Sequence, residues 1–229
     1  MKKIIAFTIL TLIGFNSFAN DNAKRITEQY LRKDISEFKN GGNNMITYYV
    51  DVVNASQLIN EYINNPNIYK KTYHKRIINI KAVASGIKTD FLGKKYVIAN
   101  GENKFEYVSL EIHQKDDLLN INKGDELNLI CAGSLNNAKF PILKNCLKTD
   151  VYLQMFLEKT MNDINELKED DHPKNYYEAV YLGLSQFDAE KPNQLNKYKT
   201  IDDLFENKTL FNEIWILVGK KWYSDRYIN

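Results

Sequence analysis

Apolar side chains recur at every second position between residues 75 and 148, which is the spacing of half-buried β-strands. In "RIINIKAVASGI" (76–87) the side chains of Ile78, Ile80, Ala82 and Ala84 are expected on one face. In "FEYVSLEIH" (105–113) two opposite faces are expected, one with Val108, Leu110 and Ile112, the other with Phe105, Tyr107, Ser109 and Glu111. This alternation predicts strands with one face toward a core.

Three further segments complete a set of five short strands: "KKYVIAN" (94–100), "ELNLICAG" (126–133) and "KFPILKNCLK" (139–148). Glycine- and asparagine-rich turns separate them, and "DDLLNINKGDE" (116–126) forms a short helical turn or loop between the third and fourth. Five short strands with one small connector at this point are typical of a Greek-key barrel, most economically an OB-fold.

Helical spacing flanks this region on both sides. Residues 22–39 predict a helix ended by "NGGNN", residues 45–53 a short strand or extended lead-in, and residues 54–65 a helix capped by Asn54 or Ser56 and stopped by Pro66. After Asp150, apolar side chains at helical spacing predict several more helices that pack on the barrel or on each other. The apolar face of the first is formed by Tyr152, Met155, Phe156, Ile164 and Leu167. The apolar face of the second is formed by Tyr177, Val180, Tyr181, Leu184 and Phe187.

The predicted fold class is therefore α+β: a five-stranded OB-fold-like β-barrel with N-terminal helices and a C-terminal helical extension. The expected organisation is a signal peptide (1–19), an N-terminal helix and lead-in (20–53), the OB-fold-like domain (54–150) and a helical extension (151–229).

The first residues have the three-part pattern of a secretory signal. Lys2 and Lys3 precede an apolar run to Phe15, and Ser17-Phe18-Ala19 supplies small residues for cleavage after Ala19. The run of about 12 residues is shorter than the ~20 that a membrane anchor needs. We therefore expect export to the periplasm or secretion.

Removing the signal changes the charge balance. The whole chain has 31 Lys and Arg against 29 Asp and Glu, and residues 1–19 hold two of the Lys and none of the acids. The mature chain is therefore formally neutral, which argues against tight binding to a nucleic-acid backbone. No later apolar run reaches membrane length, so no transmembrane segment is expected in the mature chain.

Both cysteines of the chain, Cys131 and Cys146, lie in the predicted fourth and fifth strands. Antiparallel pairing of these strands can bring them opposite each other at disulfide distance, and export leads to an oxidising compartment. A structural disulfide is favoured over two buried thiols and over a redox or metal pair, since the chain has no CxxC motif and its three His show no ligand spacing.

Two stretches carry a resemblance to a known family. "NASQLINEYINNPNIYKKTYHKRIINIKAVASGI" and "VSLEI…LLNINKGDELNLICAGSL…FPILKNCL" resemble the tRNA_anti-like OB-fold family over about residues 54–148. The resemblance implies an OB-fold with a paired-cysteine ending. It implies neither tRNA binding nor any catalytic residue, and residues 22–53 and 151–229 lie outside it.

The sequence has no recognisable catalytic motif. It lacks a Gly-rich phosphate loop, HExxH, GxSxG and clustered metal ligands, and its acids are best explained as surface residues. We therefore expect no enzymatic activity, no catalytic residue, no cofactor and no metal.

An OB-fold binds ligands on the face of its second and third strands and with the loops beside them. Here that surface would present aromatic, cationic and amide side chains, namely Tyr96, Phe105, Tyr107, Lys94, Lys95, Asn136 and Asn137, with Lys88 and Lys139 in the adjoining loops. These could stack on sugars or bases or anchor a protein. The alternative is that the terminal helices cover Phe105 and Tyr107.

These features favour an exported, non-enzymatic OB-fold module that binds a protein or a cell-envelope component. The second hypothesis is oligosaccharide or oligonucleotide binding through the aromatic face of strands two and three. The sequence does not identify the partner or the oligomeric state.

Overall fold

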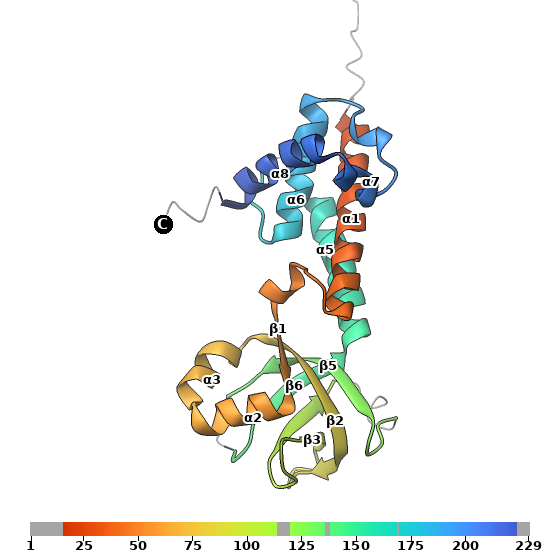
Figure 1. The fold of residues 1–229 in the computed structure, drawn as a ribbon. Coiled ribbons are helices and arrows are strands. Elements are labelled where there is room, and N and C mark those ends of the chain that lie inside the picture. Colours follow the sequence, from red (N-terminus) through yellow and green to blue (C-terminus); the bar gives the residue numbers. More distant parts are fainter. Residues whose placement is uncertain (1–15, 114–119, 136–137, 169, 224–229) are drawn as a thin grey trace, which may run out of the picture. The chain divides into compact units, whose positions relative to one another are not determined.

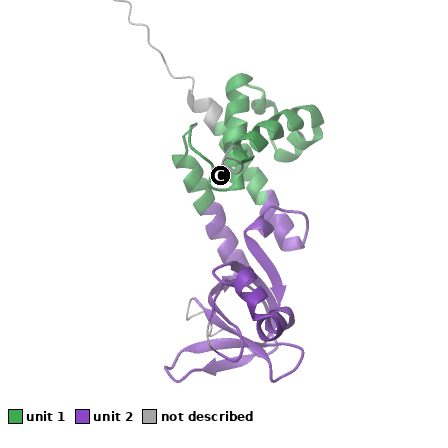
Figure 2. Cartoon of the chain, turned by 90° about the vertical axis from the view of Figure 1, so that its left-hand side faces the viewer, with its two compact units in different colours: residues 1–32, 159–229 green, residues 33–158 purple. Residues whose placement is uncertain are grey.

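The structure is a computed structural model that describes residues 16–113, 120–135, 138–168 and 170–223. The chain divides into two compact units: residues 1–32 with 159–229, and residues 33–158 (Figure 2). The helices α1 (Asn16–Asn40) and α5 (Thr149–Glu166) contribute residues to both units. Each unit is described by itself below.

A closed five-stranded barrel forms the core of residues 33–158 (Figure 1). Its strands are β2 (Ile77–Thr89), β3 (Lys95–Asn100), β4 (Tyr107–Ile112), β5 (Glu126–Gly133) and β6 (Ile142–Lys148). They follow the order β2-β3-β4-β6-β5, and β5 pairs back to β2. The β4–β6 pair is parallel and the other barrel pairs are antiparallel. This topology confirms the predicted OB-fold-like barrel and the α+β class.

The alternating pattern decides which side chains fill the barrel. Val108, Leu110 and Ile112 of β4 are buried, whereas Tyr107, Ser109 and Glu111 between them are only partly buried. Ile80 and Leu129, which face each other on β2 and β5, join the same core cluster. The predicted inward face of the third strand is therefore confirmed.

A sixth strand, β1 (Val50–Asn54), lies parallel to β2 at the edge of the sheet. It follows a short 3₁₀ helix, Ile46–Tyr48, so the segment predicted as a strand or a lead-in contains both. The crossover to β2 contains two helices, α2 (Ala55–Asn64) and α3 (Pro66–Tyr73). A parallel pair needs such a connection, because a hairpin turn reverses the chain.

Asn54 caps α2, as predicted, because its side-chain oxygen accepts a hydrogen bond from the Gln57 backbone N–H at 2.8 Å. Pro66 ends the α2 segment but also begins α3, which the sequence pattern does not predict. Proline suits the first turn of a helix, where its missing N–H would have no partner. Leu58 and Ile59 of α2 pack into the barrel core.

Cys131 and Cys146 form a disulfide between β5 and β6, as predicted. The register shifts beside it: Ile130 pairs with Leu147 and Ala132 pairs with Lys144, so two residues of β6 oppose Cys131. This bulge places Asn145 at a φ of 53°. Closing a loop over a separation of 15 residues stabilises the barrel by about 3 kcal/mol in the chain-entropy model.

The other unit is helical. Besides parts of α1 and α5 it contains α6 (Tyr176–Glu190), α7 (Ile201–Glu206), α8 (Lys208–Tyr223) and a 3₁₀ turn, Leu195–Lys197. The apolar stripe predicted for α6 is confirmed, since all five of its members are buried; they are Tyr177, Val180, Tyr181, Leu184 and Phe187. Among the described residues, no helix is both long and apolar enough to cross a bilayer.

The predicted stripe of α5 is partly wrong. Met155 is 54% exposed, and Leu153 and Leu157 are buried instead. Apolar residues occur on both sides of this helix within "VYLQMFL" (151–157), so the local pattern offers two faces. These residues belong to the unit of residues 33–158, and tertiary packing selects the face that is buried.

Candidate binding site on the barrel

The outward face of β2, β3 and β4 carries the side chains that the sequence indicated. Lys88 pairs with Tyr96 between β2 and β3, and Asn100 pairs with Tyr107 between β3 and β4. Lys88, Tyr96 and Tyr107 line one cavity of about 310 Å³. The remainder of its lining comes from the β2–β3 turn, from β4 and from the segment that leads into β6: Thr89, Asp90, Phe91, Ser109, Ala138, Lys139, Phe140 and Ile142.

Tyr107 is the centre of this site. The Lys88 Nζ donates a hydrogen bond to the Tyr107 hydroxyl at 2.9 Å and lies 4.2 Å from the centre of its ring. The ring of Phe140 lies 4.8 Å from that of Tyr107, at an interplanar angle of 52°. Two aromatic rings and an ammonium group therefore converge on one wall of the cavity.

Tyr96 also lines the cavity, where it contacts Asp90. Its hydroxyl donates to the Asp90 Oδ2 at 3.4 Å, and burial is the main cause that raises the pKa of Tyr96 above its ordinary value. Tyr96 is therefore a neutral hydrogen-bonding group at physiological pH.

The remaining predicted residues do not line this cavity. Lys94 pairs with Glu111, with Nζ and Oε2 2.7 Å apart, and this hydrogen bond is the main cause that raises the pKa of Lys94. Lys95 is exposed at the start of β3. Phe105 is 73% exposed in the turn before β4. The predicted residues Asn136 and Asn137 lie outside the described residues.

Within residues 33–158, the contacts of Phe105 and Tyr107 come from the barrel and its loops. Phe105 is exposed, and Tyr107 is only partly buried. The ring that packs on Tyr107 comes from Phe140, in the connection between β5 and β6. Sequence reasoning placed Lys139 at this loop and missed Phe140, although an aromatic residue next to a loop lysine is a signal that could have found it.

The chemistry of the cavity suits recognition of a polar ligand with flat faces. Tyr107 and Phe140 offer ring surfaces, Lys88 and Lys139 offer cations, and Ser109 offers a hydroxyl. Aromatic rings with a few polar groups are the usual lining of small-ligand sites, and about 300 Å³ is at the small end of their range. The cavity therefore suits one unit of a larger molecule.

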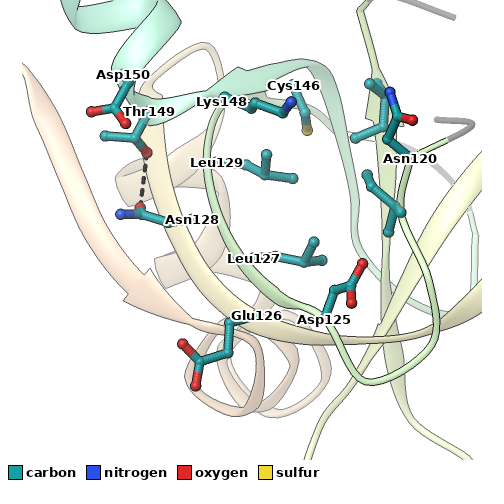
Figure 3. Close-up of a pocket in the computed structure, with 12 residues that line it drawn as sticks. Asn120, Asp125, Glu126, Leu127, Asn128, Leu129, Cys146, Lys148, Thr149 and Asp150 are labelled. Atoms are coloured by element: carbon teal, nitrogen blue, oxygen red, sulfur yellow. Dashed lines mark hydrogen bonds between the residues drawn. The ribbon is translucent and has the colours of Figure 1, made fainter. Parts of the chain in front are cut away.

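A second cavity, of about 480 Å³, lies at one end of the barrel (Figure 3). Leu127, Leu129, Asn128 and Thr149 are among its lining residues, and the Thr149 hydroxyl donates a hydrogen bond to the Asn128 Oδ1 at 2.8 Å. Ile112, Leu127, Leu129 and Cys146 belong to the barrel core. This cavity is therefore the open end of the core, and the aromatic cavity is the better candidate site.

In the part of the chain that the structure describes, no group of three His, Cys, Asp or Glu residues is placed to hold a metal ion. Asp90 is the one carboxylate among the described lining of the aromatic cavity. Its oxygens accept hydrogen bonds from Tyr96 and from the backbone of the β2–β3 turn.

A family model identifies the family of this chain. A family model described as tRNA_anti-like matches residues 1–147, which extends further toward the N-terminus than the resemblance seen in residues 54–148. A search among curated proteins finds no match. One solved structure, of a lipoprotein from Klebsiella pneumoniae named for a proposed nucleic acid-binding role, is 15% identical; the match covers 42% of this chain and 91% of that chain, with a TM-score of 0.35. A TM-score this low carries no inference about this chain.

Proposed function

Because the chain belongs to the tRNA_anti-like family of OB-fold proteins, we propose that it is an exported, non-enzymatic binding module that engages a protein or cell-envelope component. The observation that carries this proposal is the convergence of Tyr107, Phe140 and Lys88 on one cavity of the OB-fold face. OB-folds use this face and its adjoining loops to bind oligomeric ligands.

Two features support export. The first 19 residues have the pattern of a secretory signal, and the disulfide between Cys131 and Cys146 is of the kind that persists in oxidising compartments. The proposed absence of catalysis is supported by Asp90, the carboxylate among the described lining residues of the cavity. Its oxygens accept hydrogen bonds from the backbone of the β2–β3 turn and from the Tyr96 hydroxyl. A general acid or base has to lie within hydrogen-bonding distance of the substrate proton that it transfers, whereas the hydrogen bonds of Asp90 are made within the protein.

The chemistry of the cavity favours an oligosaccharide of the envelope over an oligonucleotide. Ring faces and hydroxyl groups recognise sugars as well as bases, so stacking alone does not separate the two. Charge does separate the two classes of ligand, because the mature chain holds equal numbers of basic and acidic residues. A nucleic-acid ligand would draw most of its affinity from an excess of positive charge.

The test compares binding of the mature protein and its Tyr107→Ala variant to solubilised envelope glycans and, separately, to single-stranded oligonucleotides. We expect glycan binding, weakened about tenfold by Tyr107→Ala because one stacking surface is worth about 1–3 kcal/mol. The melting temperature should change little, since Tyr107 is only partly buried.

Phe105→Ala is the matched control, because this exposed ring lies in the turn before β4, two residues from Tyr107, and does not line the cavity. It should bind as the wild type does. Equal affinities for the wild type and Tyr107→Ala, tighter binding to oligonucleotides, or hydrolysis of the glycan would each contradict the proposal.

A further inference from the structure

The turn that joins β2 to β3 exposes two large apolar side chains. Phe91 is 94% exposed and Leu92 is 78% exposed, the two highest values among the exposed large apolar residues. Single exposed apolar residues are common on protein surfaces, but adjacent ones at the tip of a hairpin form a small convex apolar patch.

Hydrogen bonds hold this tip in shape. The Asp90 Oδ1 accepts from the backbone N–H of Leu92 at 2.9 Å and from that of Lys94 at 2.8 Å. The Asp90 backbone N–H donates to the Lys94 carbonyl at 2.9 Å, and that of Gly93 donates to the Asp90 carbonyl at 3.0 Å. Gly93 has a φ of 79°, which favours glycine. The exposure of Phe91 and Leu92 is therefore built into the turn.

Cations surround the apolar tip. Lys88 is the second-last residue of β2, Lys94 follows Gly93, and Lys95 is the first residue of β3. Two of these lysines have partners, because Lys88 donates to the Tyr107 hydroxyl on the cavity wall and Lys94 pairs with Glu111. Asp90 holds the turn, which leaves Lys95 as the exposed cation at the tip. Residues 88–95 thus carry three positive charges and one negative charge. This distribution is complementary to an anionic surface.

We propose that the β2–β3 turn is a contact site for anionic lipid membranes, in which Phe91 and Leu92 enter the interface and Lys95 faces lipid phosphates. Apolar side chains next to Lys residues are the composition of interfacial membrane contacts. A protein partner is the weaker fit, because a stable protein interface buries about 800 Å² on each side and two side chains on a convex tip offer far less.

This site goes beyond the proposed ligand cavity, although the two adjoin. Phe91 borders the cavity as well as the tip, whereas Leu92 belongs to the tip alone. Insertion of the turn would hold the mouth of the cavity close to the membrane, where an envelope ligand is concentrated. The two sites can be separated, because Tyr107 lines the cavity and takes no part in the tip.

The experiment is co-sedimentation of the mature protein with vesicles of phosphatidylcholine alone or mixed with phosphatidylglycerol. We expect binding to the anionic vesicles that weakens as salt is raised. Leu92→Ser together with Phe91→Ser should weaken it at least about tenfold, because burial of two large apolar side chains is lost. Lys95→Gln should weaken it about fivefold through the loss of one charge.

Ile68→Ser is the control, since Ile68 is 53% exposed on α3, away from the tip in the sequence, and its replacement should leave vesicle binding unchanged. Tyr107→Ala should also keep vesicle binding, and this separates failure of the cavity from failure of the tip. Equal binding by the wild type and the Phe91→Ser, Leu92→Ser variant, or no vesicle binding by the wild type, would overturn the proposal and leave the tip to a protein partner.

Discussion

Asp188 on α6 places a carboxylate inside the helical unit, where its side chain is 3% exposed. Burial raises its pKa above the ordinary 3.8, and hydrogen bonds involving Asn22 and the Leu195 backbone offset part of this rise. Its Oδ1 has no hydrogen-bond partner within the described residues. The folded helical unit therefore holds the proton of Asp188 more tightly than the unfolded chain does.

This predicts that the contribution of Asp188 to the free energy of unfolding falls as pH rises. Below pH 3.8 the contribution of Asp188 is fully present, and it is lost as pH rises through the higher pKa of the folded state. Asp188→Asn should remove this part of the slope when the free energy of unfolding is measured by denaturant titration from pH 3.8 to neutrality.

Asp203→Asn is the matched control, with the titration extended below pH 3.8, because hydrogen bonds with Thr200 lower the pKa of Asp203 and the stability that it contributes is lost as pH falls from 3.8 through this lower pKa. Its removal should therefore change the slope in the opposite sense, in this lower pH range. Slopes that change in the same direction in both variants would contradict this account of Asp188.

At the scale of single residues, the sequence predicts side chains that lie on regular strands better than those in connections. Tyr96 and Tyr107 reach the cavity because alternation along β3 and β4 decides which way they face. Phe140 precedes β6, where no period applies, and its packing on Tyr107 depends on the path of the loop. Lys94 faces a partner, Glu111, that only strand pairing brings within reach.

At the scale of elements, α6 and α8 lie close together at Gly183. A methyl group at this position would lie 2.7 Å from the Val218 Cγ2 and 2.8 Å from the Val218 backbone nitrogen. Gly183→Ala should therefore lower the free energy of unfolding by about 1–3 kcal/mol, as overpacking does. Denaturant unfolding monitored by circular dichroism would measure this change.

Gly219→Ala on α8 provides the control. A methyl group there has no atom within 4 Å outside its own helix, so the higher helix propensity of alanine should raise stability by up to about 1 kcal/mol. If Gly183→Ala is as stable as Gly219→Ala, the close contact of the two helices is not present in solution.

The periodicity of the sequence predicts the number and order of the barrel strands, because each has one buried face. It predicts β1 only as one of two alternatives, a strand or an extended lead-in over residues 45–53, since five residues before a helix give too short a pattern, and pairing with β2 depends on a distant segment. It also misjudges α5, where Met155 and Leu157 both lie within apolar patterns and tertiary packing buries only Leu157. The local sequence pattern therefore determines which face of a barrel strand is buried. Long-range packing determines whether an edge strand such as β1 forms and which face of a helix such as α5 is buried.

At the scale of the whole molecule, the central claim is an exported barrel closed by a disulfide that presents a binding face outside the cytoplasm. The signal pattern, the neutral mature charge and the Cys131–Cys146 bond support it together. The signal pattern and the disulfide are linked physically, because export supplies the oxidising compartment in which the bond forms and persists.

Intact-mass spectrometry of the full-length gene product recovered from its native cells tests this claim most directly, with thiol alkylation before and after reduction. The account predicts a chain that begins at Asn20, with no alkylated cysteine before reduction and both Cys131 and Cys146 alkylated after it. A chain that retains residues 1–19 in the cytosol, with both thiols open to alkylation without reduction, would contradict it.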